Sequence, residues 1–231
     1  NRLKDIGLID NVSIFPHPVK NTLVSQNQTK NFLSVKSNKK LTIGAYGFCL
    51  PNKGFDELIQ TIPILKKSNL DFHINIFSSI YNDEYYYCYE NLKNLVKHLD
   101  VENEVTINKE YLHPEVIQNL LVQQDLLIYP YQSSNESSSA SIRDGLSSLT
   151  PILVTPLPIF DDVSDLVEYL PGFSPHDLAR GILAWYQESK SKNKDIKKLN
   201  YDRAQLINSR RFSKLSIRLQ SIINSLEINK D

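Results

Sequence analysis

Cysteine, net charge and long hydrophobic runs are all scarce in this sequence of 231 residues. Its two cysteines, Cys49 and Cys88, are too few for a disulfide framework or a zinc site, and we expect both to pack as small apolar side chains in the reducing cytoplasm. Lysine and arginine together number 26, and aspartate and glutamate 26, so no basic field favours nucleic acid as a partner. No apolar run approaches the roughly 20 residues of a membrane-spanning helix.

The sequence does contain a regular alternation of short apolar runs and helical patterns. It is 41% hydrophobic and 23% charged, which is ordinary for a globular protein, and its length is ample for one α/β domain and small for two. Strands that alternate with amphipathic helices are typical of a parallel sheet, so the pattern predicts a doubly wound, Rossmann-like α/β domain. The expected strands are residues 41–46, 72–77, 104–107, 125–129 and 152–154, and the expected helices are 55–67 with an interruption at Pro63, 84–99, 114–123, 138–149, 174–188 and 201–226.

The stretch from residue 125 to residue 163 carries the most specific pattern. An apolar run stops at Pro130, and a serine-rich loop then leads into the helix expected at 138–149. In parallel sheets, ligands bind at the carboxyl ends of the strands, where helix N-termini offer N–H groups that suit a phosphate. Glu136 in this loop would repel a phosphate, but its carboxylate can accept hydrogen bonds from sugar hydroxyls.

A second candidate is the loop AYGFCLPNKG, which follows the first expected strand and ends at Gly54. Gly47 within it marks a turn or a close approach of the backbone. A turn that follows a strand, opens a helix and carries a lysine can clamp an anion, and Lys53 would then pair with a diphosphate. The alternative is a solvated surface lysine, as most lysines are.

Three segments of the chain resemble one enzyme family in order and spacing. The span ESSSASIRD, from Glu136 to Asp144, resembles the E-x7-E signature of retaining glycosyltransferases of the GT-B fold, in family four. GFCLPNKGFDELI upstream and TPILVTPLPIFDD downstream resemble the phosphate loop and the following strand of the same family. The resemblance covers the middle of the chain. It implies a hexosyltransferase domain that binds a nucleotide-diphosphate sugar and transfers the sugar, with retention, to an acceptor hydroxyl.

The resemblance also implies roles for the charged residues. Glu136 would contact the donor sugar and Asp144 would hold the ribose hydroxyls, with the diphosphate between them over the helix N-terminus. Lys53 would stabilise the departing diphosphate, so Glu136 and Lys53 are the expected catalytic residues. Asp144 is one methylene shorter than the glutamate that is usual in the family.

The remaining donor contacts are implied in the same way. Many relatives have an arginine after the first glycine of the loop, where this chain has Phe48. Arg143 is a candidate replacement, or else it forms an ion pair with Asp144 or another acid. The loop near Glu110 would face the nucleobase. The expected donor-binding residues are Gly47, Lys53, Ser138, Ser139, Ala140, Arg143, Asp144, Tyr111 and Leu112.

The domain organisation implied by the resemblance is the C-terminal half of a two-domain enzyme. Residues 1–20 would be an exit strand from a missing N-terminal domain, 21–40 a linker, 41–190 the nucleotide-sugar-binding domain and 191–231 a C-terminal helical segment. The expected partners are a nucleotide sugar, a glycan or lipid-linked acceptor and the missing domain, which would supply any peripheral membrane contact. No metal or other cofactor is implied, since no Asp-x-Asp occurs. Polysaccharide or glycoconjugate synthesis is the usual setting, and such a half would turn over little or nothing alone.

Two other functions stay open on the sequence. A nucleotide-sugar epimerase on the same fold would need a carboxylate or histidine facing the anomeric carbon, and none stands out. A non-catalytic α/β docking module is favoured by Phe48 and Asp144, which depart from the family pattern. Fold alone does not decide between these functions.

Overall fold

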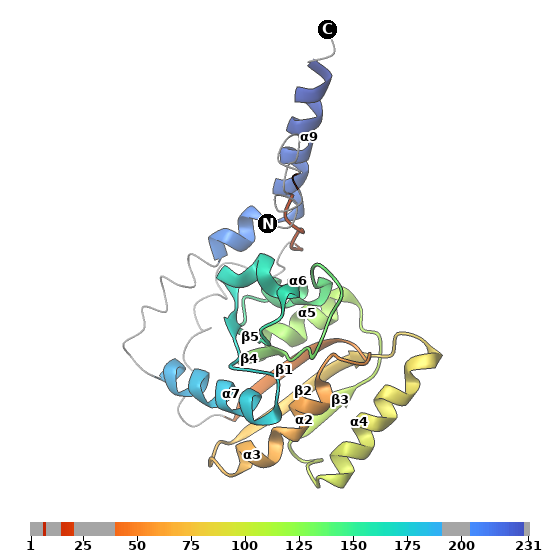
Figure 1. Ribbon diagram of the computed structural model, residues 1–231, viewed down its shortest axis with the longest axis vertical. Helices are drawn as coiled ribbons and strands as arrows, with labels where there is room; N and C mark the ends of the chain where they lie inside the picture. The colour runs from red at the N-terminus through yellow and green to blue at the C-terminus, as the bar shows by residue number, and fades with distance from the viewer. Residues whose placement is uncertain (1–6, 8–14, 21–39, 191–203, 229–231) are drawn as a thin grey trace.

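The computed structural model describes residue 7 and residues 15–20, 40–190 and 204–228. Its centre is a six-stranded sheet in the order β3-β2-β1-β4-β5-β6, in which all neighbouring strands pair in parallel (Figure 1). This confirms the predicted doubly wound sheet. The strands are β1 (Leu41–Phe48), β2 (Phe72–Ser79), β3 (Val105–Asn108), β4 (Leu126–Tyr129), β5 (Ile152–Val154) and β6 (Glu168–Tyr169).

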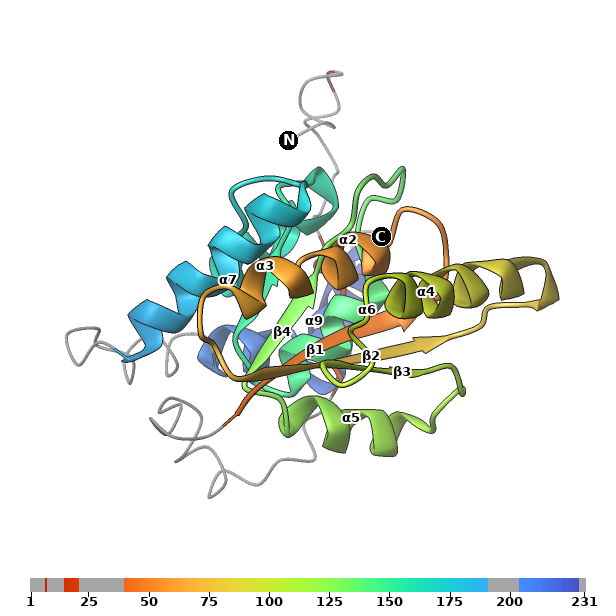
Figure 2. The same ribbon diagram turned by 90° about the horizontal axis from the view of Figure 1, so that it is seen from below.

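Helices cover both faces of the sheet, as Figure 2 shows. Alternate residues of β4 enter two different hydrophobic clusters, because a strand covered on both faces buries side chains in both directions and therefore reads as a continuous apolar run. One face carries α2 (Phe55–Gln60), α3 (Ile62–Lys66), α4 (Tyr86–His98) and α7 (Pro175–Lys190), and the other carries α5 (Pro114–Val122) and α6 (Ala140–Ser147).

The order of the strands reverses beside β1. The chain runs outward from β1 through β2 to β3, crosses back to β4, and continues outward on the other side through β5 to β6. β1 therefore pairs with both β2 and β4. The crevice at the carboxyl ends of β1 and β4 is the place where doubly wound sheets bind their ligands.

Most predicted elements are present, with ends that differ by a few residues. The interruption predicted at Pro63 is confirmed, because α2 ends at Gln60 and Pro63 lies in the first turn of α3, where its missing N–H is not needed. Within the described residues, a 3-10 helix η3 (Pro158–Leu166) and the strand β6 were not predicted, and the start of the helix predicted at 84–99 is the 3-10 helix η2 (Asp83–Tyr85). The predicted helix at 201–226 is wrong as one continuous element, since residues 204–209 are helical and α9 (Phe212–Ile228) begins after a turn.

Two segments far apart in the sequence meet beside the sheet. The buried Val19 donates its N–H to the carbonyl oxygen of Arg210 at 2.8 Å and accepts from the N–H of Phe212 at 3.3 Å. Of the exit strand expected at 1–20, residues 7 and 15–20 are described, and they form only the bridge at Val19 and no strand. The rest of that segment, and residues 21–39 of the linker expected at 21–40, lie outside the described residues. α9 extends away from the sheet in Figure 1. No helix within the described ranges is long and apolar enough to cross a membrane.

Candidate functional site

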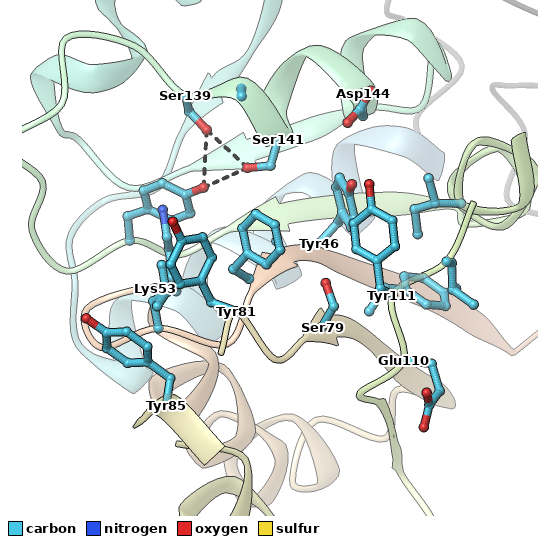
Figure 3. A pocket seen from close by; sticks show the side chains of 18 of the residues that line it. Tyr46, Lys53, Ser79, Tyr81, Tyr85, Glu110, Tyr111, Ser139, Ser141 and Asp144 are labelled. Carbon is cyan, nitrogen blue, oxygen red and sulfur yellow. Dashed lines mark hydrogen bonds between the residues drawn. The ribbon is translucent and has the colours of Figure 1, made fainter. Parts of the chain in front are cut away.

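A cavity of about 670 Å³ lies at the carboxyl edge of the sheet, where the strand order reverses (Figure 3). That volume is in the range of small-molecule and cofactor sites. Its walls come from the ends of β1 and β2, from the loops after β1, β3 and β4, and from the start of α6. The lining residues are Lys20, Tyr46, Gly47, Phe48, Leu50, Lys53, Phe77, Ser79, Tyr81, Tyr85, Glu110, Tyr111, Leu112, Ile117, Tyr131, Glu136, Ser139, Ala140, Ser141 and Asp144.

The loop after β1 brings Lys53 into this cavity. Gly54, at the N-cap of α2, has a φ of 73°, and a Cβ at this position would lie 1.8 Å from the carbonyl oxygen of Pro130. Only a glycine lets the loop approach the chain after β4 so closely. As a result, Nζ of Lys53 lies 4.0 Å from the centre of the Tyr131 ring, in a cation–π contact.

Three hydroxyl groups stand at the N-terminus of α6. Oη of Tyr131 is 2.7 Å from Oγ of Ser141 and 3.1 Å from Oγ of Ser139, and the two serine oxygens are 3.1 Å apart (Figure 3). Ser139 caps the helix, and its Oγ accepts the N–H of Ile142 at 3.5 Å. The N–H groups of Ala140 and Ser141 lie in the first turn, where a helix offers no internal acceptor. With the nearby lysine ammonium, these donors and the helix dipole form a surface that suits an anion.

An ion pair occupies the opposite end of the cavity. Nζ of Lys20 lies 2.7 Å from Oδ1 of Asp144, whose side chain is 12% exposed. Burial, and then the charge of the Asp144 carboxylate, raise the pKa of the neighbouring Tyr46 phenol, so this phenol stays protonated at neutral pH. This end therefore offers paired charges and a neutral hydroxyl, in contrast to the positive surface at α6.

Exposed aromatic rings form one wall of the cavity. Phe48, the last residue of β1, meets Tyr81 edge to face with ring centroids 5.2 Å apart, and Tyr81 meets Tyr85 at 6.2 Å. This wall stands where the family resemblance led us to expect an arginine. An apolar surface, to which flat rings can pack, takes the place of a second cation beside Lys53.

Most of the predicted site residues line this one cavity. Lys53 and Glu136, the expected catalytic pair, are both among the lining residues, and Tyr111 stands on the same side as Asp144 in Figure 3. Ser138 is half-buried and does not line the cavity. In the part of the chain that the structure describes, no group of three His, Cys, Asp or Glu side chains could hold a metal ion. The predicted residues that line the cavity are Gly47, Lys53, Tyr111, Leu112, Glu136, Ser139, Ala140 and Asp144.

Arg143 is placed elsewhere. Its side chain is 3% exposed, forms an ion pair with Asp162 and donates to the carbonyl oxygen of Ser139 at 3.2 Å. It therefore joins the first turn of α6 to η3. Of the two alternatives for this residue, the structure shows the ion pair with another acid, and the side chain does not reach the cavity as a replacement phosphate cation.

Replacing Arg143 with alanine should lower the free energy of unfolding by about 2–3 kcal/mol. Removal of one partner from a buried ion pair costs about 3–5 kcal/mol, and the effect here is smaller because the Asp162 side chain is 36% exposed. The free energy is measured by urea denaturation. Arg180→Ala is the matched control, since its pair with Asp177 lies at the surface and should contribute less than about 1 kcal/mol. Equal losses of stability in both variants would contradict the inference that Arg143 stabilises the fold by joining α6 to η3.

Lys20 and Tyr131 line the cavity but were not predicted from the sequence as site residues. Tyr131 could have been found, because it lies two residues beyond Tyr129 and continued strand alternation would place both on one face. Lys20 lies two residues after Pro18, but no local pattern links it to Asp144. Contacts of this kind arise only when distant segments pack together.

Comparison with known proteins places this arrangement among glycosyltransferase folds. Neither a scan against protein-family models nor a search of the curated proteins found a match. A glycosyltransferase from Rickettsia africae ESF-5 is similar with a TM-score of 0.68 at 15% identity, over 91% of this chain and 57% of that one. Anabaena HepE, solved in complex with UDP-glucose, has a TM-score of 0.62 at 16% identity, over 82% of this chain and 49% of HepE.

A third solved structure is itself a single domain. The C-terminal domain of LpcC, a glycosyl transferase group 1 family protein from Francisella tularensis, has a TM-score of 0.57 at 14% identity, over 87% of this chain and 96% of that domain. The chain thus spans about half the length of the Rickettsia and Anabaena proteins and nearly all of the Francisella domain. It has the fold of the C-terminal domain of GT-B glycosyltransferases.

Proposed function

We propose that this chain is the donor-binding domain of a retaining, family-four glycosyltransferase and that its cavity binds a nucleotide-diphosphate sugar. One observation carries the proposal: a single cavity, at the reversal of strand order, contains Lys53, the N-terminus of α6 and Glu136. An anion-binding surface beside a sugar-binding carboxylate matches the chemistry of a sugar linked to a diphosphate. The presence of UDP-glucose in the HepE structure, which has a similar fold, supports this choice.

The diphosphate would lie between Lys53 and α6. The lysine ammonium supplies charge-assisted hydrogen bonds from one side, and the N–H groups of Ala140 and Ser141 supply donors from the other. Ser139 and Tyr131 add hydroxyl groups at the same place. The nucleoside would then extend toward Asp144, with the base near the loop after β3.

Transfer in this scheme requires stabilisation of the leaving group. The bond from the sugar C1 to a diphosphate oxygen breaks, and the oxygen of an acceptor hydroxyl bonds to the same face of C1. The proton of that hydroxyl passes to the departing diphosphate. Negative charge gathers on the departing diphosphate, where Lys53 and the start of α6 stabilise it. These groups of the chain meet the added charge, so the scheme needs no metal ion.

Glu136→Ala should remove recognition of the sugar and spare recognition of the nucleotide. Hydrogen bonds to a carboxylate contribute about 1.5–3 kcal/mol, so the variant should bind UDP-glucose about tenfold to a hundredfold more weakly and bind UDP as before. Titration calorimetry with the two ligands measures this difference. Glu102→Ala, at an exposed turn remote from the cavity, should leave both affinities unchanged. An unaltered preference for UDP-glucose in Glu136→Ala would contradict the role proposed for this carboxylate.

The proposal itself is tested by thermal unfolding with UDP, GDP, ADP and dTDP. A ligand that binds only the folded protein increases the free energy of unfolding, by about 2.7 kcal/mol when its concentration is a hundred times its Kd, and so raises the melting temperature. We expect one nucleotide to stabilise the domain clearly more than the other three. A flat response to all four would reject nucleotide-sugar binding and would favour a docking module.

The cellular role follows from the same proposal. We place the enzyme in the cytoplasm, in the synthesis of a polysaccharide or glycoconjugate, with a glycan or lipid-linked acceptor. The acceptor site and any peripheral membrane contact would belong to an N-terminal domain like the part of the Rickettsia and Anabaena proteins that this chain does not match.

A further inference from the structure

The fold holds Lys20 at the nucleoside end of the cavity. The residue before it, Val19, is buried and joined by two backbone hydrogen bonds to Arg210 and Phe212. This bridge fixes the main chain from which the Lys20 side chain reaches Asp144. A lysine on an anchored backbone loses less conformational freedom on binding than one on an unanchored loop.

The ion pair supplies the opposite charge that the Asp144 carboxylate needs when a ligand buries it. The side chain of Asp144 is only 12% exposed, whereas that of Lys20 is 53% exposed. A ligand bound at this end of the cavity would remove the remaining water from the carboxylate. A carboxylate that loses water without a partner is strongly destabilised, and Lys20 provides the opposite charge before the ligand arrives.

The two side chains also complement a vicinal diol. Each ribose hydroxyl can donate one hydrogen bond and accept others, while a carboxylate only accepts and an ammonium only donates. One N–H of Lys20 is directed at Oδ1 of Asp144, and an ammonium carries three N–H groups. Asp144 and Lys20 together can therefore satisfy both the donor and the acceptor of a ribose hydroxyl. Asp144, one methylene shorter than a glutamate, could not reach as far alone.

Building on the function proposed above, in which Asp144 holds the ribose hydroxyls, we propose that Lys20 is a further specificity-determining residue: through its ion pair with Asp144 it makes the site specific for ribonucleotides over 2′-deoxyribonucleotides. The recognised group is the 2′,3′-diol of a nucleoside diphosphate. The carboxylate accepts from one hydroxyl, and the ammonium both holds the carboxylate and donates to the diol.

Titration calorimetry with matched pairs of ligands tests this assignment. The pairs are UDP with 2′-deoxy-UDP, GDP with 2′-deoxy-GDP, and ADP with 2′-deoxy-ADP. We expect the wild-type protein to prefer the ribose form of its best nucleotide by about tenfold, as one charge-assisted hydrogen bond provides. Lys20→Met, which keeps the aliphatic stem, should lose most of this preference, and Lys20→Arg should keep it. Lys93→Met, on the far side of α4, is the control and should bind as the wild type does.

Asp144→Asn extends the test to the pair as a unit. It should lose the same preference, and Lys20→Met added to it should cause little further loss, because the two groups act through one contact. A Lys20→Met protein that keeps the ribose preference, or that binds the ribose form more tightly, overturns the inference. A wild-type protein that binds nucleotides without ribose preference overturns this inference alone, whereas one that binds no nucleoside diphosphate overturns the proposed function as well. Melting temperatures without ligand show that each variant is folded.

Discussion

Lys53→Met is expected to weaken the binding of a nucleoside diphosphate by about tenfold to a hundredfold and to leave the binding of the bare nucleoside unchanged. A hydrogen bond to a charged group contributes about 1.5–3 kcal/mol, which corresponds to that range of affinity. Methionine retains an apolar stem against the Tyr131 ring, so the loop keeps its packing while the charge is lost. The dependence of affinity on salt should fall in the same variant, because one screened charge has been removed.

The measurement is a comparison of uridine, UMP and UDP, or the matching series for the preferred base. Lys67→Met, an exposed lysine at the end of α3, is the control and should bind all three like the wild type. A loss that is equal for nucleoside and diphosphate would mean that Lys53 shapes the loop and does not contact the phosphates. Unchanged affinity for the diphosphate would remove Lys53 from the site altogether.

The fold was predictable from the sequence because its strands are buried on both faces. Such strands appear as apolar runs whatever lies around them, and β4, with Leu126 and Ile128 on one side and Leu127 and Tyr129 on the other, is the clearest example. The start of α7 was also predictable, since Oγ of Ser174 accepts the N–H of Asp177 in a local capping box. Each of these patterns is local, since it involves only residues that are a few positions apart in the sequence.

The missed elements depend on contacts that are remote in sequence. β6 has only two residues and is a strand because it pairs with Leu153 and Val154 of β5. The predicted single helix at the C-terminal end divides near Arg211, where the chain bridges to Val19. No pattern within either segment carries that information.

The same distinction applies to the candidate site. Glu136 and Lys53 follow strands that end at one edge of the sheet, so their shared cavity was predictable once the sheet was. Arg143 lies only one residue before Asp144, yet its side chain pairs with Asp162, and only the packing of η3 decides that. Lys20 reaches Asp144 through a tertiary bridge. Local patterns thus locate the cavity, and long-range packing decides which charges enter it.

The position of Lys53 depends in turn on the loop that carries it. The N–H of Gln132 donates to the carbonyl oxygen of Asn52 at 2.8 Å, and Gly54 packs directly against the carbonyl group of Pro130. These contacts tie the loop after β1 to the loop after β4, across the reversal of strand order. A change that separates the two loops should therefore affect stability and anion binding together.

Gly54→Ala is that change, and it should lower the free energy of unfolding by about 2–5 kcal/mol. Forcing extra atoms into a packed site costs about 1–3 kcal/mol, and a left-handed backbone costs a residue with a Cβ about 1–2 kcal/mol more. Both costs apply here, since φ is 73° and the new Cβ would lie 1.8 Å from a backbone oxygen that no rotamer change can move. Urea denaturation measures the loss of stability, and titration with UDP measures the accompanying loss of binding.

Asn52→Gly separates the steric effect from a general sensitivity of the loop. Asn52 also has a left-handed backbone, with a φ of 64°, and glycine adopts this conformation without strain. Its carbonyl oxygen still accepts from Gln132, so stability should change by less than about 1 kcal/mol and UDP binding should persist. If Gly54→Ala unfolded at the wild-type urea concentration, the two loops would not need their close contact. If it unfolded early but bound UDP normally while folded, Lys53 would not depend on that contact for its place in the cavity.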